Sequence, residues 1–296
     1  MSSALLTFVL MQYVVSVKAG LVNHVQGAAN VVEMEQVRRG RPIETADHGY
    51  AEVLLTPGSF LRIGENSAVV LDGVELESVS LHVLEGPALI EVVDISKKYP
   101  IKVTTGNLTT NIVATGVYRF EDGVATVIDG KLRTADSGLT YEKGWQVFVK
   151  DNYRARKMKR VQPTSLDVYS QARSQTIAEA NAALAASLSP SYGLTDPYWL
   201  FAPTFGHYTF IPVARCRSPY GQYYHAAGTR PVATPRYSTS NHSGGTTNPP
   251  VSSGGNTNTS SGGGTPAPVT VAAPSGERTA PAVYIESKST PVGATQ

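Results

Sequence analysis

Between residues 21 and 149 the chain alternates apolar and polar side chains in short runs that are broken by turn residues. The clearest runs lie at 51–55, 60–64, 79–86, 101–105, 117–121 and 145–149. A period of two is typical of half-buried strands, and the Gly and Pro residues between the runs favour tight turns. No helical pattern separates the runs. We therefore predict a mainly β domain over residues 20–150, either an antiparallel β-sandwich or a short β-solenoid.

The pattern changes after a basic run, YRARKMKR, at residues 153–160. We interpret 151–163 as a basic linker and predict a single long helix over 164–189, because Thr164 and Asp167 fit a capping box. One helical stripe collects Leu166, Tyr169, Ile177, Ala180, Leu184 and Leu188. This apolar stripe is thin and rich in alanine, so the helix is expected to pack along another element.

Residues 190–227 combine many aromatic rings with closely spaced prolines. Prolines at this density exclude a long helix or a central strand, so we predict an extended aromatic segment held by its rings. The rings could form a strap that seals the β domain, or an exposed surface that stacks on a sugar or a protein partner. The candidate binding residues are Tyr198, Trp199, Phe201, Phe205, Tyr208, Phe210, Tyr220 and Tyr223.

Both ends of the chain differ from this middle part. Residues 4–17 are apolar and uncharged, and the small residues that follow predict a signal peptide at 1–19, hence a periplasmic or extracellular protein. No second run approaches the ~20 apolar residues of a membrane helix, so no stable membrane span is expected. Residues 228–296 are rich in Ser, Gly, Thr and Pro and predict a disordered tail.

Charge and motifs point away from several functions. A net charge of +2 gives no general attraction for nucleic acid. The six histidines and one cysteine lack the spacing of a metal site, and no nucleotide-binding or nucleophile motif is present. We therefore expect no metal, no cofactor and no enzyme. Glu85, Glu91 and Asp94 could converge for acid–base catalysis, but a solvated sheet face is the preferred interpretation of Glu91.

Five motifs occur in an order that resembles the FecR domain family: EGPALIEV (85–92), IKVTT (101–105), IVATGVYRFE (112–121), VIDGKLRT (127–134) and YEKGWQV (141–147). The resemblance covers roughly residues 20–149. It implies a β-rich extracytoplasmic domain, whose namesake transmits a signal between a TonB-dependent iron-citrate receptor and a sigma factor. That transducer also has a cytoplasmic anti-sigma region and a transmembrane helix, for which this sequence has no counterpart, so only the β module is carried over.

These observations favour an exported, non-enzymatic binding or scaffold module of the bacterial cell envelope, with an envelope protein or polysaccharide as partner. One alternative is an extracytoplasmic signalling component that contacts a TonB-dependent receptor or a sigma/anti-sigma system. The other is an enzyme that acts on envelope glycans, which would need the carboxylates to converge.

Overall fold

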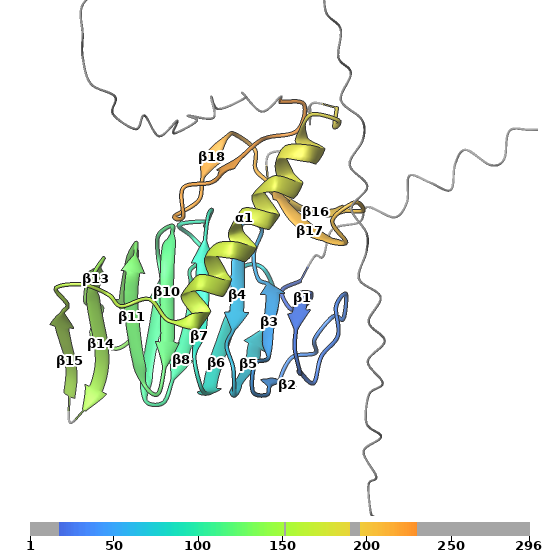
Figure 1. Ribbon diagram of the computed structural model, residues 1–296. Coiled ribbons are helices and arrows are strands. Elements are labelled where there is room, and N and C mark those ends of the chain that lie inside the picture. Colours follow the sequence, from blue (N-terminus) through green and yellow to red (C-terminus); the bar gives the residue numbers. More distant parts are fainter. Residues whose placement is uncertain (1–17, 151, 190–195, 230–296) are drawn as a thin grey trace, which may run out of the picture. The chain divides into compact units, whose positions relative to one another are not determined.

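A computed structural model describes residues 18–150, 152–189 and 196–229, in which two large sheets dominate (Figure 1). The eight-stranded sheet contains, from edge to edge, β1 (Leu21–Gln26), β3 (Tyr50–Leu54), β4 (Ser59–Ile63), β7 (Ala88–Val92), β10 (Gly116–Glu121), β11 (Val124–Asp129), β14 (Trp145–Lys150) and β15 (Asn152–Lys157). The seven-stranded sheet contains β13 (Thr140–Glu142), β12 (Lys131–Thr134), β9 (Leu108–Ile112), β8 (Ile101–Thr105), β6 (Ser80–Glu85), β5 (Ser67–Gly73) and β2 (Pro42–Thr45).

The chain alternates between the two sheets, mostly one hairpin at a time. β3 and β4 belong to the first sheet, β5 and β6 to the second, and β7 returns to the first. Within each sheet the strands follow their order along the chain, as in a solenoid. Neighbouring strands are nevertheless antiparallel, except for the parallel pair β6 and β8. The prediction of a mainly antiparallel β domain is confirmed, and each of its two alternatives describes part of the arrangement.

The inner faces of the sheets share one apolar core. Leu61 and Ile90 from the eight-stranded sheet meet Leu81, Val103 and Ile112 from the seven-stranded sheet, and all five side chains are buried. The period-two alternation of the sequence supplies these residues, because every second side chain of a strand points to the same face. This core covers the inner face of each sheet, so only the outer face can pack against other elements.

Residues 152–157 form the edge strand β15, so the prediction of a linker over 151–163 is wrong for these residues. Ala155 lies half-buried against the core, whereas Arg154 and Arg156 on either side are exposed. The basic run therefore keeps the period of a strand. Charged side chains are common on edge strands, where they discourage indiscriminate pairing.

Helix α1 (Ser165–Ala185) lies across the outer face of the eight-stranded sheet (Figure 1). It begins with the predicted capping box. The Thr164 hydroxyl accepts a hydrogen bond from the Asp167 N–H, and the Asp167 carboxylate accepts one from the Thr164 N–H at 2.6 Å. Arg119 of β10 forms an ion pair with the same carboxylate. The first turn of the helix is therefore stabilised by its own capping box and by an ion pair with the sheet.

Replacing Thr164 with Ala should lower the free energy of unfolding by about 1 kcal/mol, because the first turn loses its capping hydroxyl. Chemical denaturation measures this loss. Thr176→Ala is the matched control, since Thr176 is half-buried in the middle of α1, away from the cap, and alanine is the better helix former. Equal losses in the two variants would contradict a specific role for the cap.

The aromatic segment forms two small hairpins, β16 (Tyr198–Ala202) with β17 (His207–Ile211) and β18 (Cys216–Arg217) with β19 (Tyr223–Tyr224). Trp199, Phe210 and Tyr224 are buried with Phe60 of β4 and Ile177 of α1 in a second apolar cluster. The backbone is extended, as the prolines predict. Its rings join the helix to the sheet, which is the arrangement of a strap.

Two predictions concern residues that the structure largely leaves undescribed. The signal peptide at 1–19 lies outside the described residues except for Lys18 and Ala19, and the tail at 228–296 lies outside them except for Gly228 and Thr229. Ala19 is fully buried, and its N–H donates to the Val74 carbonyl at 2.8 Å. Cleavage directly after Ala19 would remove this hydrogen bond and the buried side chain. Within the described part of the chain, no helix is long and apolar enough to span a membrane.

Candidate functional site

Three charged side chains lie together on the outer face of the eight-stranded sheet, beneath α1. Glu52 of β3, Arg62 of β4 and Glu91 of β7 come from neighbouring strands, and all three side chains are 0% exposed. Arg62 Nε donates to Glu52 Oε2 at 2.9 Å, and Arg62 Nη1 donates to Glu91 Oε2 at 2.7 Å. One guanidinium group therefore bridges two carboxylates.

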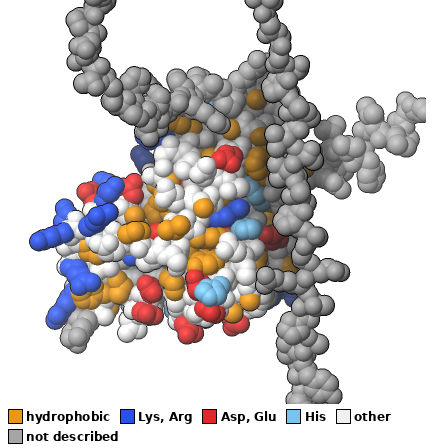
Figure 2. Space-filling model, in the orientation of Figure 1, with side chains coloured by type: hydrophobic (Ala, Val, Ile, Leu, Met, Phe, Trp, Pro, Cys, Tyr) orange, Lys and Arg blue, Asp and Glu red, His pale blue; other side chains and the backbone are white. Residues whose placement is uncertain are grey.

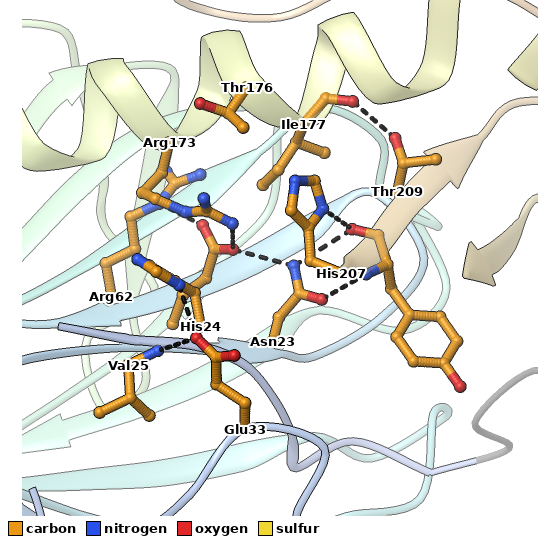
Figure 3. A network of polar contacts seen from close by, with 12 residues as sticks. Asn23, His24, Val25, Glu33, Arg62, Arg173, Thr176, Ile177, His207 and Thr209 are labelled. Carbon is orange, nitrogen blue, oxygen red and sulfur yellow. Dashed lines mark hydrogen bonds and ion pairs between the residues drawn. The ribbon is translucent and has the colours of Figure 1, made fainter. Parts of the chain in front are cut away.

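Helix α1 completes this network from above. Arg173 Nη2 donates to Glu52 Oε1 at 3.0 Å, and Ser174 Oγ donates to Glu91 Oε1 at 2.8 Å. Ser170 Oγ accepts a hydrogen bond of 2.7 Å from the arginine of the sheet. The three helix residues share one face because they are spaced by three and four positions. Figure 3 shows the two arginines converging from the sheet and the helix.

The first aromatic hairpin is attached to the same network through Asn23 of β1. Asn23 Nδ2 donates to Glu52 Oε1 at 2.9 Å and to the Tyr208 carbonyl at 3.1 Å. Its Oδ1 accepts from the Tyr208 N–H at 2.7 Å (Figure 3). These contacts join β1, the network and β17, three elements that are distant in sequence.

A second buried asparagine attaches both hairpins to the helix. Asn181 Nδ2 donates to the carbonyls of Phe210 and His225, each at 2.9 Å, and Asn181 Oδ1 accepts from the His225 N–H at 2.7 Å. Asn181 is fully buried, so its polar atoms depend on these backbone partners. The sheet, α1 and the hairpins are thus connected by directional contacts as well as by apolar packing.

The network is electrically balanced, since Arg62 and Arg173 offset Glu52 and Glu91. Burial raises the pKa of Glu52, but the charges of Arg173 and Arg62 outweigh this effect and hold the pKa at about 2. Burial also raises the pKa of Glu91, and here it prevails over Arg62 and the Ser174 hydroxyl. Glu52 has two guanidinium partners, whereas Glu91 has one. The contacts of these four side chains therefore join β3, β4 and β7 to α1.

The three carboxylates considered for acid–base catalysis do not converge. Glu85 is exposed at the end of β6 in the seven-stranded sheet, Glu91 is buried beneath α1, and Asp94 is half-buried beyond β7. The interpretation of Glu91 as part of a solvated sheet face is therefore wrong. The period-two alternation of the sequence correctly placed Glu91 on the outer face of its sheet, but α1 covers that face. The near-continuous apolar character of β7, ALIEV, is typical of a strand buried on both faces and was the available signal.

The eight aromatic candidates occupy different environments. Trp199 and Phe210 are fully buried, which corrects the prediction that they offer a binding surface. Tyr223 is 41% exposed and stacks with the Arg215 guanidinium at 3.9 Å. The remaining five are half-buried: Tyr198, Phe201, Phe205, Tyr208 and Tyr220. The buried rings belong to the apolar cluster beneath α1, so the eight do not form one exposed surface.

One group of side chains could hold a metal ion, although its spacing in the sequence did not reveal it. Asp47, His48 and Glu65 each offer a ligand atom, and these atoms lie within 4.8 Å of one another. Asp47 and His48 are exposed on the turn before β3, and Glu65 follows β4. Glu65 also accepts hydrogen bonds from the Tyr50 hydroxyl and the His48 N–H. The β3–β4 hairpin is what brings these residues together.

His207 should make the fold sensitive to mild acid. Burial lowers its pKa from 6.5, and the charge of Arg173 acts in the same direction. The unfolded chain therefore takes up a proton before the folded protein does, so stability is lost as the pH falls below 6.5. Between about pH 7.5 and 5.5 the parent should lose more unfolding free energy than His207→Gln, by at most about 1.4 kcal/mol per pH unit. Identical pH profiles from denaturant titrations would refute this role.

One family model and two solved structures match part of the chain. Residues 41–133, from the start of β2 into β12, match the family model described as FecR protein. Two crystal structures, at 2.50 and 1.65 Å resolution, of a "putative anti-sigma factor" from Parabacteroides distasonis ATCC 8503 are each 15% identical, with a TM-score of 0.34. Each match covers 40% of this chain and 60% of the solved chain. No curated protein matches the chain. The part of the two-sheet fold at residues 41–133 is thus similar to the FecR family.

Proposed function

We propose that the chain is a non-enzymatic binding module of the cell envelope, in which the FecR domain, α1 and the aromatic hairpins form one rigid unit that binds a protein partner. The observation that carries this proposal is the buried charged network beneath α1. Glu52, Arg62 and Glu91 are 0% exposed and Arg173 is 10% exposed, so these charges serve to hold elements together. A rigid unit binds a partner at a low cost in ordering.

The same observation disfavours the glycan-active enzyme. Glycoside hydrolysis needs two carboxyl groups that both reach the scissile bond. Glu91 lies beneath the helix, and its oxygens are engaged by Arg62 and Ser174. Glu85 and Asp94 lie elsewhere, one of them in the other sheet. We therefore favour a binding function over glycan hydrolysis for this fold.

Cross-linking in intact cells tests the proposal. The full-length chain, tagged at its C-terminus, is cross-linked and then recovered after cell fractionation. We expect recovery from the envelope fraction, joined to an envelope protein. Recovery from the cytoplasm alone, or an envelope fraction without any cross-linked protein, would overturn the proposal. Deletion of the hairpins is not a suitable variant, because it would uncover Phe60 and the apolar cluster around it.

A signalling component is the second candidate, and the FecR match at residues 41–133 favours it. The same experiment separates the two, because the identity of the cross-linked protein differs. A TonB-dependent receptor or a sigma regulator would support signalling. A structural protein of the envelope would support a scaffold.

A further inference from the structure

The two large sheets have four edge strands, of which the chain itself covers two and a third is very short. Residues 28–37 run beside β1 and β2, where the Val22 N–H donates to the Glu35 carbonyl at 2.9 Å and the Asn30 N–H donates to the Glu44 carbonyl at 3.0 Å. The third edge, β13, is only 3 residues long. The fourth, β15, has 6 residues and pairs only with β14 among the strands that the structure describes. Its other side presents backbone groups for pairing.

This open edge carries positive charge. Arg154 and Arg156 are exposed on one face of β15, and neither forms an ion pair with a described residue. Lys157, Lys159 and Arg160 are exposed close by in sequence. Figure 2 shows Lys and Arg side chains gathered at the β14–β15 end of the molecule. A partner at this edge should therefore carry negative charge.

The opposite face of β15 is apolar at its centre. Ala155 stands opposite the fully buried Val147 of β14 and packs, half-buried, against the core. A strand added beside β15 would place one residue next to Ala155, facing the core. The residues before and after it would face Arg154 and Arg156, because side chains alternate along a strand. The geometry thus specifies an acidic residue, an apolar residue and a second acidic residue in succession.

A hollow adjoins the arginine face. It has a volume of about 220 Å³, and its charged lining residues are Arg119 and Arg156 with Glu121 and Asp122, beside Gln146 and Phe148 of β14. Gln146 accepts a hydrogen bond from Arg156 Nε at 2.8 Å, which leaves the other guanidinium nitrogens available to a carboxylate. An acidic side chain of an added strand would lie at the mouth of this hollow.

We propose that β15 accepts an extended peptide of a partner protein as an additional strand of the eight-stranded sheet, and that this peptide has an acidic–apolar–acidic sequence at its centre. The inference rests on the proposed binding function and specifies its surface and its ligand. Main-chain hydrogen bonds to β15 supply the affinity, and the contacts with Arg154, Ala155 and Arg156 supply the selectivity.

Fluorescence anisotropy with the full-length chain tests this inference. The probe is a labelled nonapeptide whose centre is Glu-Val-Glu, and we expect saturable binding. Arg154→Glu combined with Arg156→Glu should weaken binding about tenfold or more. The matched control is Lys102→Glu with Arg133→Glu, the same charge change at exposed positions of the seven-stranded sheet, and it should retain binding. Unfolding midpoints establish that each variant is folded.

A peptide with N-methylated backbone amides separates strand addition from simple charge attraction. Strand addition predicts that this peptide no longer binds, because its donors are blocked. Equal binding of the methylated peptide, equal binding of a Lys-Val-Lys peptide, or no binding of the Glu-Val-Glu peptide would each overturn the inference. The proposed function would survive these results if the arginine variant still cross-links to its envelope protein.

Discussion

Replacing Glu52 with Gln is expected to lower the free energy of unfolding by about 3 kcal/mol at about pH 7. The substitution keeps the shape of the side chain but removes its charge, which leaves Arg173 and Arg62 facing a neutral group. The magnitude follows from the pKa of Glu52, because the difference between 4.5 and about 2 corresponds to about 3 kcal/mol. Urea denaturation at constant pH measures the loss.

Glu91→Gln is the matched control, since it removes the other carboxylate of the same network. Burial raises the pKa of Glu91, so the folded protein already disfavours its charged form. We expect this variant to lose less stability than Glu52→Gln. A loss equal to or greater than that of Glu52→Gln would contradict this ranking of the two carboxylates.

The pH dependence of the two variants should differ in sign. The pKa of Glu52 is lower in the folded protein than in the unfolded chain, so its contribution is fully present above pH 4.5 and disappears as the pH falls through about 2. The raised pKa of Glu91 acts in the opposite direction, giving a contribution that is lost as the pH rises. The difference between the parent and Glu52→Gln should therefore shrink in acid.

Trp199→Ala should cost about 3–5 kcal/mol of unfolding free energy, because it empties the centre of the cluster beneath α1. Trp199 is fully buried, with its ring centroid 5.0 Å from that of Phe60 and 6.1 Å from that of Phe210. Loss of the ring would remove contacts with both the sheet and the second strand of its own hairpin. Thermal and chemical unfolding should both record the change.

Tyr223→Ala provides the comparison within the same aromatic segment. Tyr223 is 41% exposed and contacts mainly arginine side chains, so its loss should cost under about 1 kcal/mol. Similar losses for Trp199 and Tyr223 would mean that the hairpins are not anchored through the tryptophan. A large loss for Trp199 alone would establish the hairpins as part of the folded core.

Features set by neighbouring residues could be predicted from the sequence. The alternation of strands and the capping box of Thr164 and Asp167 depend on spacings of a few positions, and the structure contains both. The burial of Glu91 depends instead on Ser174, which lies 83 positions further along the chain. No local pattern contains that information. For β15, basic composition obscured a period-two pattern that marked a strand rather than a linker.

The structure of the aromatic segment could likewise be predicted only in part from the sequence. Its prolines indicated extended backbone, but the inward-facing rings could not be identified from the sequence. Trp199 and Leu200 are consecutive and both are buried, so both faces of β16 are covered. The alternation of apolar and polar residues cannot show which side chains of such a strand are buried. Only the positions of α1 and the sheet decide that Trp199 is enclosed while Tyr223 contacts solvent.

The alternation of hairpins between the two sheets also bears on how the protein assembles. Cutting the chain anywhere between β3 and β12 would leave strands of both sheets on each side of the cut. Neither sheet is therefore an independent folding unit. Strands that pair across an intervening hairpin, such as β11 with β14, close a loop that is effectively shorter once that hairpin has formed. Assembly can then propagate in step along the chain, each new hairpin templating the next, as in repeat proteins. This propagation ends at β15, whose outer edge can still template a further strand.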